Sequence, residues 1–336
     1  MNITDAKVKL DRVIQLSRVE MYKPIQIAET LREINLNKKL DPLKLETYRN
    51  VSKELRNKIT KQLIGKVSTS SMRFQDDLWN ESALPPSALA ILSNQNRQSS
   101  KVEEYIYQHV YAKNAHLIEI RKKLDDISSI KQIQAMFNSF DSPGLRTSAD
   151  RLYEVFVLSV LQTDLEDSNY KLSITGSKTS VKGSGAAKLI DATEGQKNEL
   201  MLAKIGHTNA ADAGLDIWSN FGVVISVKNY NLDSELFEKI LSDTPIGFLV
   251  IVCETLDVGL LKQYKKISND RPVMFITKEE IFDDTKKILD DRVRSKQFIS
   301  RFLHFYDGEF PLTNTLEEFM KNRGYRIELP DGLSWK

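Results

Sequence analysis

Three short apolar runs separated by helical patterns constrain the fold of this 336-residue chain more than any other feature. The runs are GVVISVKNY (222–230), GFLVIVCE (247–254) and PVMFITK (272–278), and helical patterns lie between them at 233–243 and 258–268. Two further candidate strands come before them, and with GVVISVKNY they are expected to form a meander: YKLSITG (170–176) and GLDIWS (214–219). This order predicts an α/β fold of the α+β kind, with a central mixed sheet flanked by helices.

The segment FNSFDSPGLRTS (137–148) divides the chain, because its Ser-Pro-Gly sequence breaks regular structure. Residues 1–140 have amphipathic helical patterns, for which we expect a helix-turn-helix-like region. Residues 147–336 should form the sheet-containing domain. Its first helix, SADRLYEVFVLSVLQ (148–162), is apolar on most faces and should be buried against the sheet. Thr147 and Asp150 suggest a capping box at its start.

Composition excludes several classes of protein. With 48 Lys and Arg against 46 Asp and Glu, the net charge is only +2, so a nucleic-acid surface must be a local patch. Cys253 is the only cysteine and there are four histidines, which argues against both a disulfide and a structural zinc site. No apolar stretch approaches the roughly 20 residues of a membrane span. We therefore expect a cytoplasmic protein without membrane association.

The best candidate for a local basic patch is the basic helix 44–61, within DPLKLETYRNVSKELRNKITKQLIGK (41–66). Asp41 is placed as an N-cap, and Gly65 suits the end of the helix. The hydroxyl-rich segment STSSMR follows the helix and could hold DNA phosphates. The alternative is a solvated helix face without a ligand. The residues expected to contact DNA are Arg49, Asn50, Lys53, Arg56, Ser70, Ser71 and Arg73.

An acid and a base interrupt the apolar pattern of two neighbouring candidate strands. Strand side chains alternate between faces, so Ser226 and Lys228 should lie together, opposite a core face that includes Val227. Asp216 lies between Leu215 and Ile217 and should point away from them. A turn at 219–222 would bring Asp216 close to Lys228. A cross-strand ion pair on a solvated face is the alternative interpretation.

This pair suits metal-dependent hydrolysis of a phosphodiester. The Asp216 carboxylate, with the backbone carbonyl of Val227, could hold a hard divalent cation. The Lys228 amine could orient water or stabilise the oxyanion. The glycine-containing segment KTSVKGSGAAK (178–188) lacks the order of a phosphate-binding loop, so we expect no nucleotide cofactor.

Asp216, the hairpin spacing and the S-V-K of 226–228 resemble the PD-(D/E)XK nuclease core. The text ADAGLDIWSNFG…ISVKNY, with YRNVSKELR and GKVSTSSMRFQDD, is similar to HaeII-type restriction endonucleases. The resemblance implies a Type II enzyme that cuts both strands of double-stranded DNA with Mg²⁺. It suggests a palindromic site containing GCGC, and a two-fold site is naturally read by a homodimer. It makes Asp216 the metal carboxylate and Lys228 the catalytic amine, in a catalytic domain at 147–336. Asn229 joins the residues expected to contact DNA.

Ser226 departs from the family pattern, which has Glu, Asp or Gln at this position. The site is therefore one carboxylate short. Glu154 is the candidate replacement, because a carboxylate on a buried helix needs a cation or a partner; a surface position or a pair with Lys is the alternative. Asp212 and Glu199 are weaker options. Ser226 also leaves open a second function, a DNA-binding regulator with an inactive nuclease domain. Within the nucleases, the alternative is a repair or junction-resolving enzyme with the same core.

Overall fold

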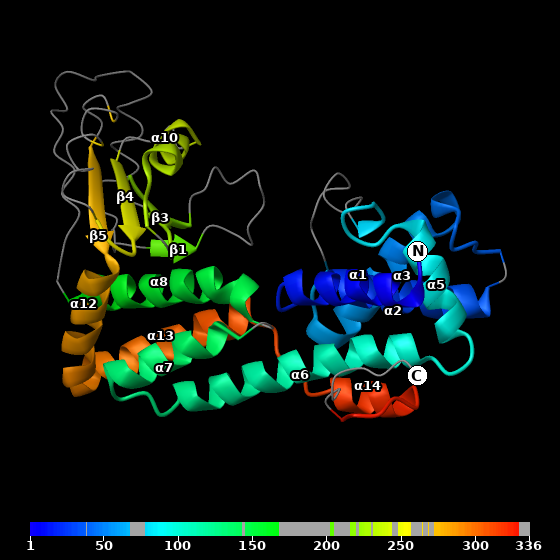
Figure 1. Ribbon diagram of the computed structural model, residues 1–336. Coiled ribbons are helices and arrows are strands. Elements are labelled where there is room, and N and C mark those ends of the chain that lie inside the picture. Colours follow the sequence, from blue (N-terminus) through cyan, green and yellow to red (C-terminus); the bar gives the residue numbers. More distant parts are fainter. Residues whose placement is uncertain are drawn as a thin grey trace, which may run out of the picture. The chain divides into compact units, whose positions relative to one another are not determined.

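The chain forms two compact units, each with its own core (Figure 1). The first consists of Met1–Ile127, Lys131–Ala149 and Tyr306–Lys336, and the second of Ser128–Ile130 and Asp150–Phe305. The structure is a computed structural model, and it describes residues 1–37, 39–67, 78–142, 145–167, 202–204, 216–219, 222–229, 231–243, 248–256, 264, 268 and 272–328. None of the helices within these residues is both long enough and apolar enough to cross a bilayer.

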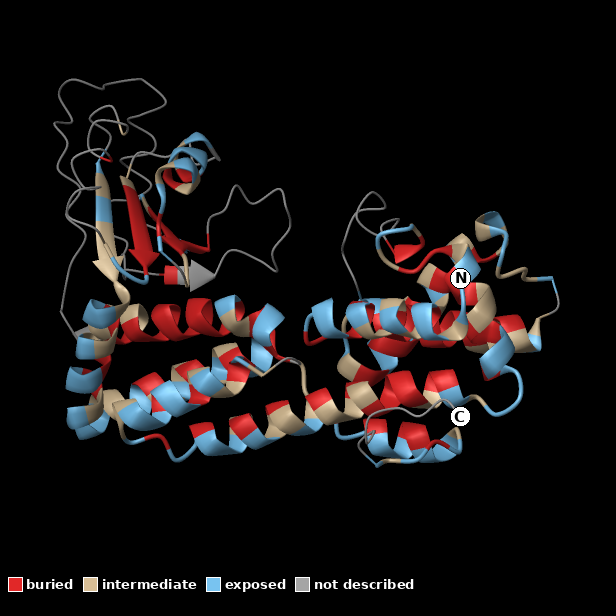
Figure 2. Cartoon of the chain, viewed as in Figure 1, coloured by how far each residue is buried: buried red, intermediate tan, exposed pale blue. Residues whose placement is uncertain are grey.

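The first unit is helical, as the sequence predicts for its N-terminal part. Its most buried element is α2, in which every residue from Pro24 to Leu31 is buried. Figure 2 shows α6 with buried residues along one side and exposed residues along the other. The first unit contains α1 (Ile3–Leu16), α2 (Tyr22–Leu36), α3 (Leu45–Ile64), α5 (Pro86–Asn96), α6 (Lys101–Leu124), most of α7 (Ile130–Phe140), the short η2 (Arg146–Ser148) and α14 (Leu316–Asn322).

Three local expectations for this unit can be compared with the structure. Gly65 ends α3 with a φ of 69° and donates its N–H to Lys61, which confirms its predicted role. The prediction for Asp41 is wrong, because residues 41–44 form a turn and α3 begins at Leu45 with Lys44 as its N-cap. The connection between α2 and α3 covers residues 37–44, longer than the three- to four-residue turn of a helix-turn-helix.

The second unit contains the sheet, whose strands follow chain order from β1 to β5. The pairs β1–β2 and β2–β3 are antiparallel, whereas β3–β4 and β4–β5 are parallel, so the predicted mixed sheet is confirmed. The candidate strand 170–176 lies outside the described residues. The elements are α8 (Ala149–Asp167), β1 (Leu202–Lys204), β2 (Ile217–Ser219), β3 (Val223–Val227), α10 (Ser234–Asp243), β4 (Phe248–Cys253), β5 (Val273–Thr277), α12 (Lys278–Asp290) and most of α13 (Arg292–Glu309).

Both faces of β3 are covered, which corrects the expected half-buried strand. Val224 packs with Phe237 and Ile240 of α10, and Ile225 and Val227 on the other face are buried as well. A strand between an antiparallel and a parallel neighbour, with both faces covered, has a continuous apolar run rather than strict alternation. Ser226 is therefore a polar residue within a buried strand.

The start of α8 differs in detail from the expected capping box. Thr147 lies in η2, and its hydroxyl donates to the backbone carbonyl of Ser17 at 3.2 Å. The helix itself is buried along most of its length, as its apolar sequence predicts.

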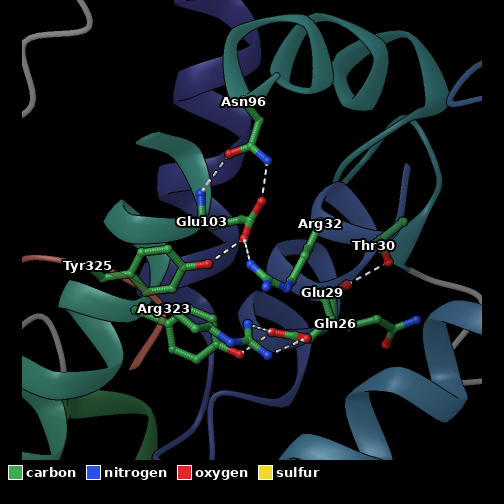
Figure 3. Close-up of polar contacts among 9 residues, drawn as sticks. Gln26, Glu29, Thr30, Arg32, Asn96, Glu103, Arg323 and Tyr325 are labelled. Carbon is green, nitrogen blue, oxygen red and sulfur yellow. Dashed lines mark hydrogen bonds and ion pairs between the residues drawn. The ribbon is translucent and has the colours of Figure 1, made fainter. Parts of the chain in front are cut away.

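Two buried carboxylates anchor the segment after α14 in the first unit (Figure 3). Glu29 accepts hydrogen bonds from Tyr107 and from both terminal nitrogens of Arg323, one of them at 3.0 Å. Glu103 accepts a hydrogen bond from the Tyr325 hydroxyl. The last described part of the chain thus belongs to the helical unit, whereas the sequence assigned it to the sheet-containing domain.

We expect Arg323→Ala to lower the free energy of unfolding by about 3–5 kcal/mol, because it removes the cation from a buried carboxylate. Urea unfolding measures the effect. Lys321→Ala, in the last turn of α14 just before Arg323, is the matched control, since it removes an exposed pair with Glu317. That variant should unfold almost like the wild type. Equal losses in the two variants would contradict a special role for Glu29 and Arg323.

Candidate active site

Asp216 lies immediately before β2. Its side chain accepts hydrogen bonds from three consecutive residues, Ser226 and Val227 at the end of β3 and Lys228 directly after it. Its Oδ2 accepts from the Val227 N–H at 2.6 Å, from the Lys228 ammonium at 3.2 Å and from the Ser226 hydroxyl at 3.4 Å. Its own N–H donates to Ile225 O at 3.0 Å. The predicted approach of Asp216 and Lys228 is therefore present, and backbone pairing between β2 and β3 fixes it.

The site is enclosed rather than solvated. The Ser226 side chain is 0% exposed, Asp216 is buried, and the Lys228 side chain is 14% exposed. A cross-strand ion pair on a solvated face does not describe this geometry. Burial raises the pKa of Asp216, and Lys228, the Val227 N–H and the Ser226 hydroxyl act in the opposite direction. Because burial has the larger effect, the ionised carboxylate would gain from further positive charge.

The donor set near Asp216 is small. Among the described residues, no three His, Cys, Asp or Glu side chains form a group that could hold a metal. In an extended strand the N–H and C=O of one residue point to the same side, so the Val227 carbonyl faces the Asp216 side of β3. Mg²⁺ commonly uses one or two carboxylates and keeps several waters. Asp216 and Val227 fit such a partial ligand set.

Glu154 is buried on α8, as its sequence context predicts, next to Tyr153. Tyr153 faces the sheet edge, because its ring lies 5.4 Å from the Lys278 ammonium. Burial raises the pKa of Tyr153, with smaller contributions from Cys253 and Glu254. Figure 1 shows α8 beyond the end of the sheet toward which the arrows of β4 and β5 point. Asp212 and Glu199 lie outside the described residues.

Two charged residues at this sheet edge were not identified from the sequence. Lys278 follows β5 and Glu254 follows β4, and their side chains approach to 3.6 Å. The Lys278 ammonium also donates to Asn229 Oδ1 at 3.2 Å, directly after Lys228. Their positions directly after two apolar runs could have identified them, since residues that follow parallel strands lie at the same edge of the sheet.

The expected DNA-contacting residues of α3 do not share one environment. Asn50 is exposed, and Arg49 and Lys53 are half-buried. Arg56 is 3% exposed and donates to Gln26 Oε1 at 3.0 Å, while burial lowers its pKa. Its guanidinium is therefore buried within the helical unit, and Arg56 does not belong to the candidate DNA surface. Ser70, Ser71 and Arg73 lie outside the described residues.

Comparison with known proteins gives consistent matches along the chain. A model of the family described as HaeII restriction endonuclease matches residues 6–325. The Type II restriction enzyme NgoBI of Neisseria gonorrhoeae is 35% identical over 96% of this chain and 97% of its own length. The Type II restriction enzyme HaeII of Haemophilus aegyptius is 36% identical over 78% of this chain and 79% of its own length. No solved structure matches the chain.

The raised pKa of Asp216 leads to a pH-dependent expectation for Asp216→Asn. Folding favours the protonated carboxyl, so the contribution of Asp216 to the stability of the wild type falls as the pH rises above about 4, the value for an unfolded Asp. The amide does not titrate. The stability of the variant relative to the wild type should therefore rise with pH and level off above the raised pKa. Unfolding free energies across this range measure the difference, and a decreasing difference would contradict the assignment.

Proposed function

The chain belongs to the HaeII restriction endonuclease family, and on that premise we propose that it hydrolyses both strands of DNA at a short palindromic site with Mg²⁺ as its cofactor. The observation that carries the catalytic assignment is the convergence of Val227, Lys228 and Ser226 on one oxygen of Asp216. An acid and an amine held together at a sheet edge are what a PD-(D/E)XK-type hydrolysis requires.

In this proposal each residue has a separate task. Asp216 and the Val227 carbonyl would hold Mg²⁺, with Glu154 as the second carboxylate in place of Ser226. Bound Mg²⁺ supplies charge neutralisation at the phosphate and a more acidic water. The Val227 N–H fixes the direction of the Asp216 carboxylate. Lys228, kept beside that carboxylate, donates to the phosphoryl oxygen on which negative charge develops. The product end would carry a 5′-phosphate.

DNA recognition is assigned to the helical unit. Asn50 on α3 has a side chain of the type that reads adenine edges, and Arg49 and Lys53 lie one turn apart along the helix. Lys44, Lys58 and Lys61 add exposed positive charge to this segment. A palindrome is read by a two-fold assembly, so we propose a homodimer acting in the cytoplasm. The family resemblance suggests GCGC within the site.

Ser226 favours one second candidate, a DNA-binding regulator with an inactive nuclease domain. A hydroxyl brings no charge to a cation site, and the Ser226 side chain is fully buried. This candidate predicts DNA binding without hydrolysis in either Mg²⁺ or Mn²⁺. A repair or junction-resolving nuclease would instead nick DNA according to its structure rather than its sequence.

We expect the purified chain to cut plasmid DNA into discrete bands in Mg²⁺. Asp216→Ala and Lys228→Ala should each lower the single-turnover rate on the order of 10²–10⁴-fold, because they remove the carboxylate and the amine from the reaction. Asp290→Asn and Lys286→Gln, at exposed positions of α12, are controls that should cut at the wild-type rate. Binding without cleavage by the wild type would overturn the enzyme assignment.

Glu154→Gln tests the replacement of the missing acid. If Glu154 contributes to the cation site, the variant should bind the DNA site with wild-type affinity but need a higher Mg²⁺ concentration for half-maximal cleavage. The shape of the side chain is kept, so its fold should survive; circular dichroism checks this. An unchanged Mg²⁺ dependence would show that another group completes the site.

A further inference from the structure

Lys278 lies where the ends of three strands meet. Its ammonium donates to Asn229 Oδ1 after β3, lies 3.6 Å from Glu254 Oε1 after β4, and sits 5.4 Å from the ring centre of Tyr153 on α8. These contacts come from three separate elements of the second unit. The side chain is thus held in one direction, although a quarter of its surface stays exposed.

The sheet register relates Lys278 to the catalytic pair. Thr277 is the register partner of Cys253 on β4, and Val252 is that of Val227 on β3. Lys228 and Lys278 each follow the last paired residue of their strand. Because Val252 and Cys253 are neighbours on β4, Lys278 is one residue further along the sheet than Lys228. The two backbones therefore begin about two strand spacings apart across the sheet and one residue apart along it, roughly 10 Å. Asn229, the neighbour of Lys228, bridges part of this distance by accepting from Lys278.

The position of Lys278 at the start of a helix is electrostatically unusual. Thr277 caps α12 in a capping box with Glu280, so Lys278 is the first helical residue. Positive charge is disfavoured at a helix N-terminus, whereas anions are favoured there. Glu279 and Glu280 already supply negative charge to the first turn of α12, so the attraction for a further anion comes from the Lys278 ammonium.

Glu254 is the anionic group that now occupies this place. Its side chain is 45% exposed, and its distance to Lys278 is at the long end for an ion pair. Such pairs between partly exposed groups contribute little to stability. A DNA phosphate oxygen could replace this carboxylate without disturbing the contacts of Lys278 with Asn229 and Tyr153.

We propose that Lys278 binds a DNA phosphate adjacent to the scissile one, and that Glu254 takes the place of that phosphate in the DNA-free chain. The inference rests on the proposed nuclease function. It adds a second phosphate-binding group, Lys278, to the catalytic pair at the same edge of the sheet. Asn229 is then a positioning residue that orients Lys278.

The test uses the full chain and a duplex that contains the site cut by the wild type. Binding is measured without divalent cation, so that no cleavage occurs, across a range of salt concentrations. One fewer phosphate contact should make the slope of log K against log salt shallower by about 0.9 and weaken binding about eightfold at 0.1 M salt. We expect this change in Lys278→Gln, and less of it in Lys278→Arg.

Neutral methylphosphonate linkages, placed singly on either side of the scissile phosphate, give a readout that a structural role would not change. At one linkage the wild type should lose about eightfold in affinity, whereas Lys278→Gln should lose nothing more there. Lys287→Gln is the matched control on the same helix, since it removes an exposed pair with Asp284. It should respond to the linkage as the wild type does.

Glu254→Gln tests the exchange itself. Removal of the competing carboxylate should tighten DNA binding, and weaker binding would overturn the stand-in role. If the wild type cuts DNA but Lys278→Gln loses affinity at every linkage as the wild type does, only this inference fails. If the wild type cuts no DNA, the proposed function and this inference fall together.

Discussion

The arrangement of the second unit depends on one buried carboxylate. Asp216 is removed from water immediately before β2, and three donors at the end of β3 and directly after it offset part of the cost. The shortest of these hydrogen bonds comes from a backbone N–H, which ties the position of the carboxylate to the path of β3. Because burial raises the pKa of Asp216 more than the donors lower it, a cation bound beside the carboxylate would stabilise its ionised form.

The strand that supplies the donors, β3, is held by packing against α10 and by pairing along both of its edges. Val224 is packed under α10, and β3 pairs with β2 on one side and β4 on the other. Lys228 emerges where this strand ends, and its N–H donates to Val252 O at 2.8 Å. An amine whose backbone is held at the end of a paired strand needs little reorganisation when negative charge develops beside it.

The sequence predicted the acid, the amine and the mixed sheet because each depends on local pattern: strand alternation, turn position and the order of elements. It did not predict β1, which is only three residues long, or the burial of Ser226, which depends on the coverage of both faces of β3. Arg56 was misassigned for a related reason. A basic residue on an amphipathic helix is expected at the surface, and the sequence does not show that Gln26 lies beside Arg56 and accepts its hydrogen bond. Lys278 and Glu254 are far apart in sequence, and only the strand register brings them together.

The anchoring of Arg323 and Tyr325 has a consequence for how the chain is made. The residues of the sheet are synthesised between two parts of the helical unit, whose buried acids Glu29 and Glu103 emerge from the ribosome about 290 and 220 residues before their partners. Until those partners are synthesised, Glu29 lacks the Arg323 guanidinium and Glu103 lacks the Tyr325 hydroxyl. A nascent or truncated chain therefore has an incomplete helical unit even when β2 and β3 already exist, so the helical unit would be the last part of the fold to be completed.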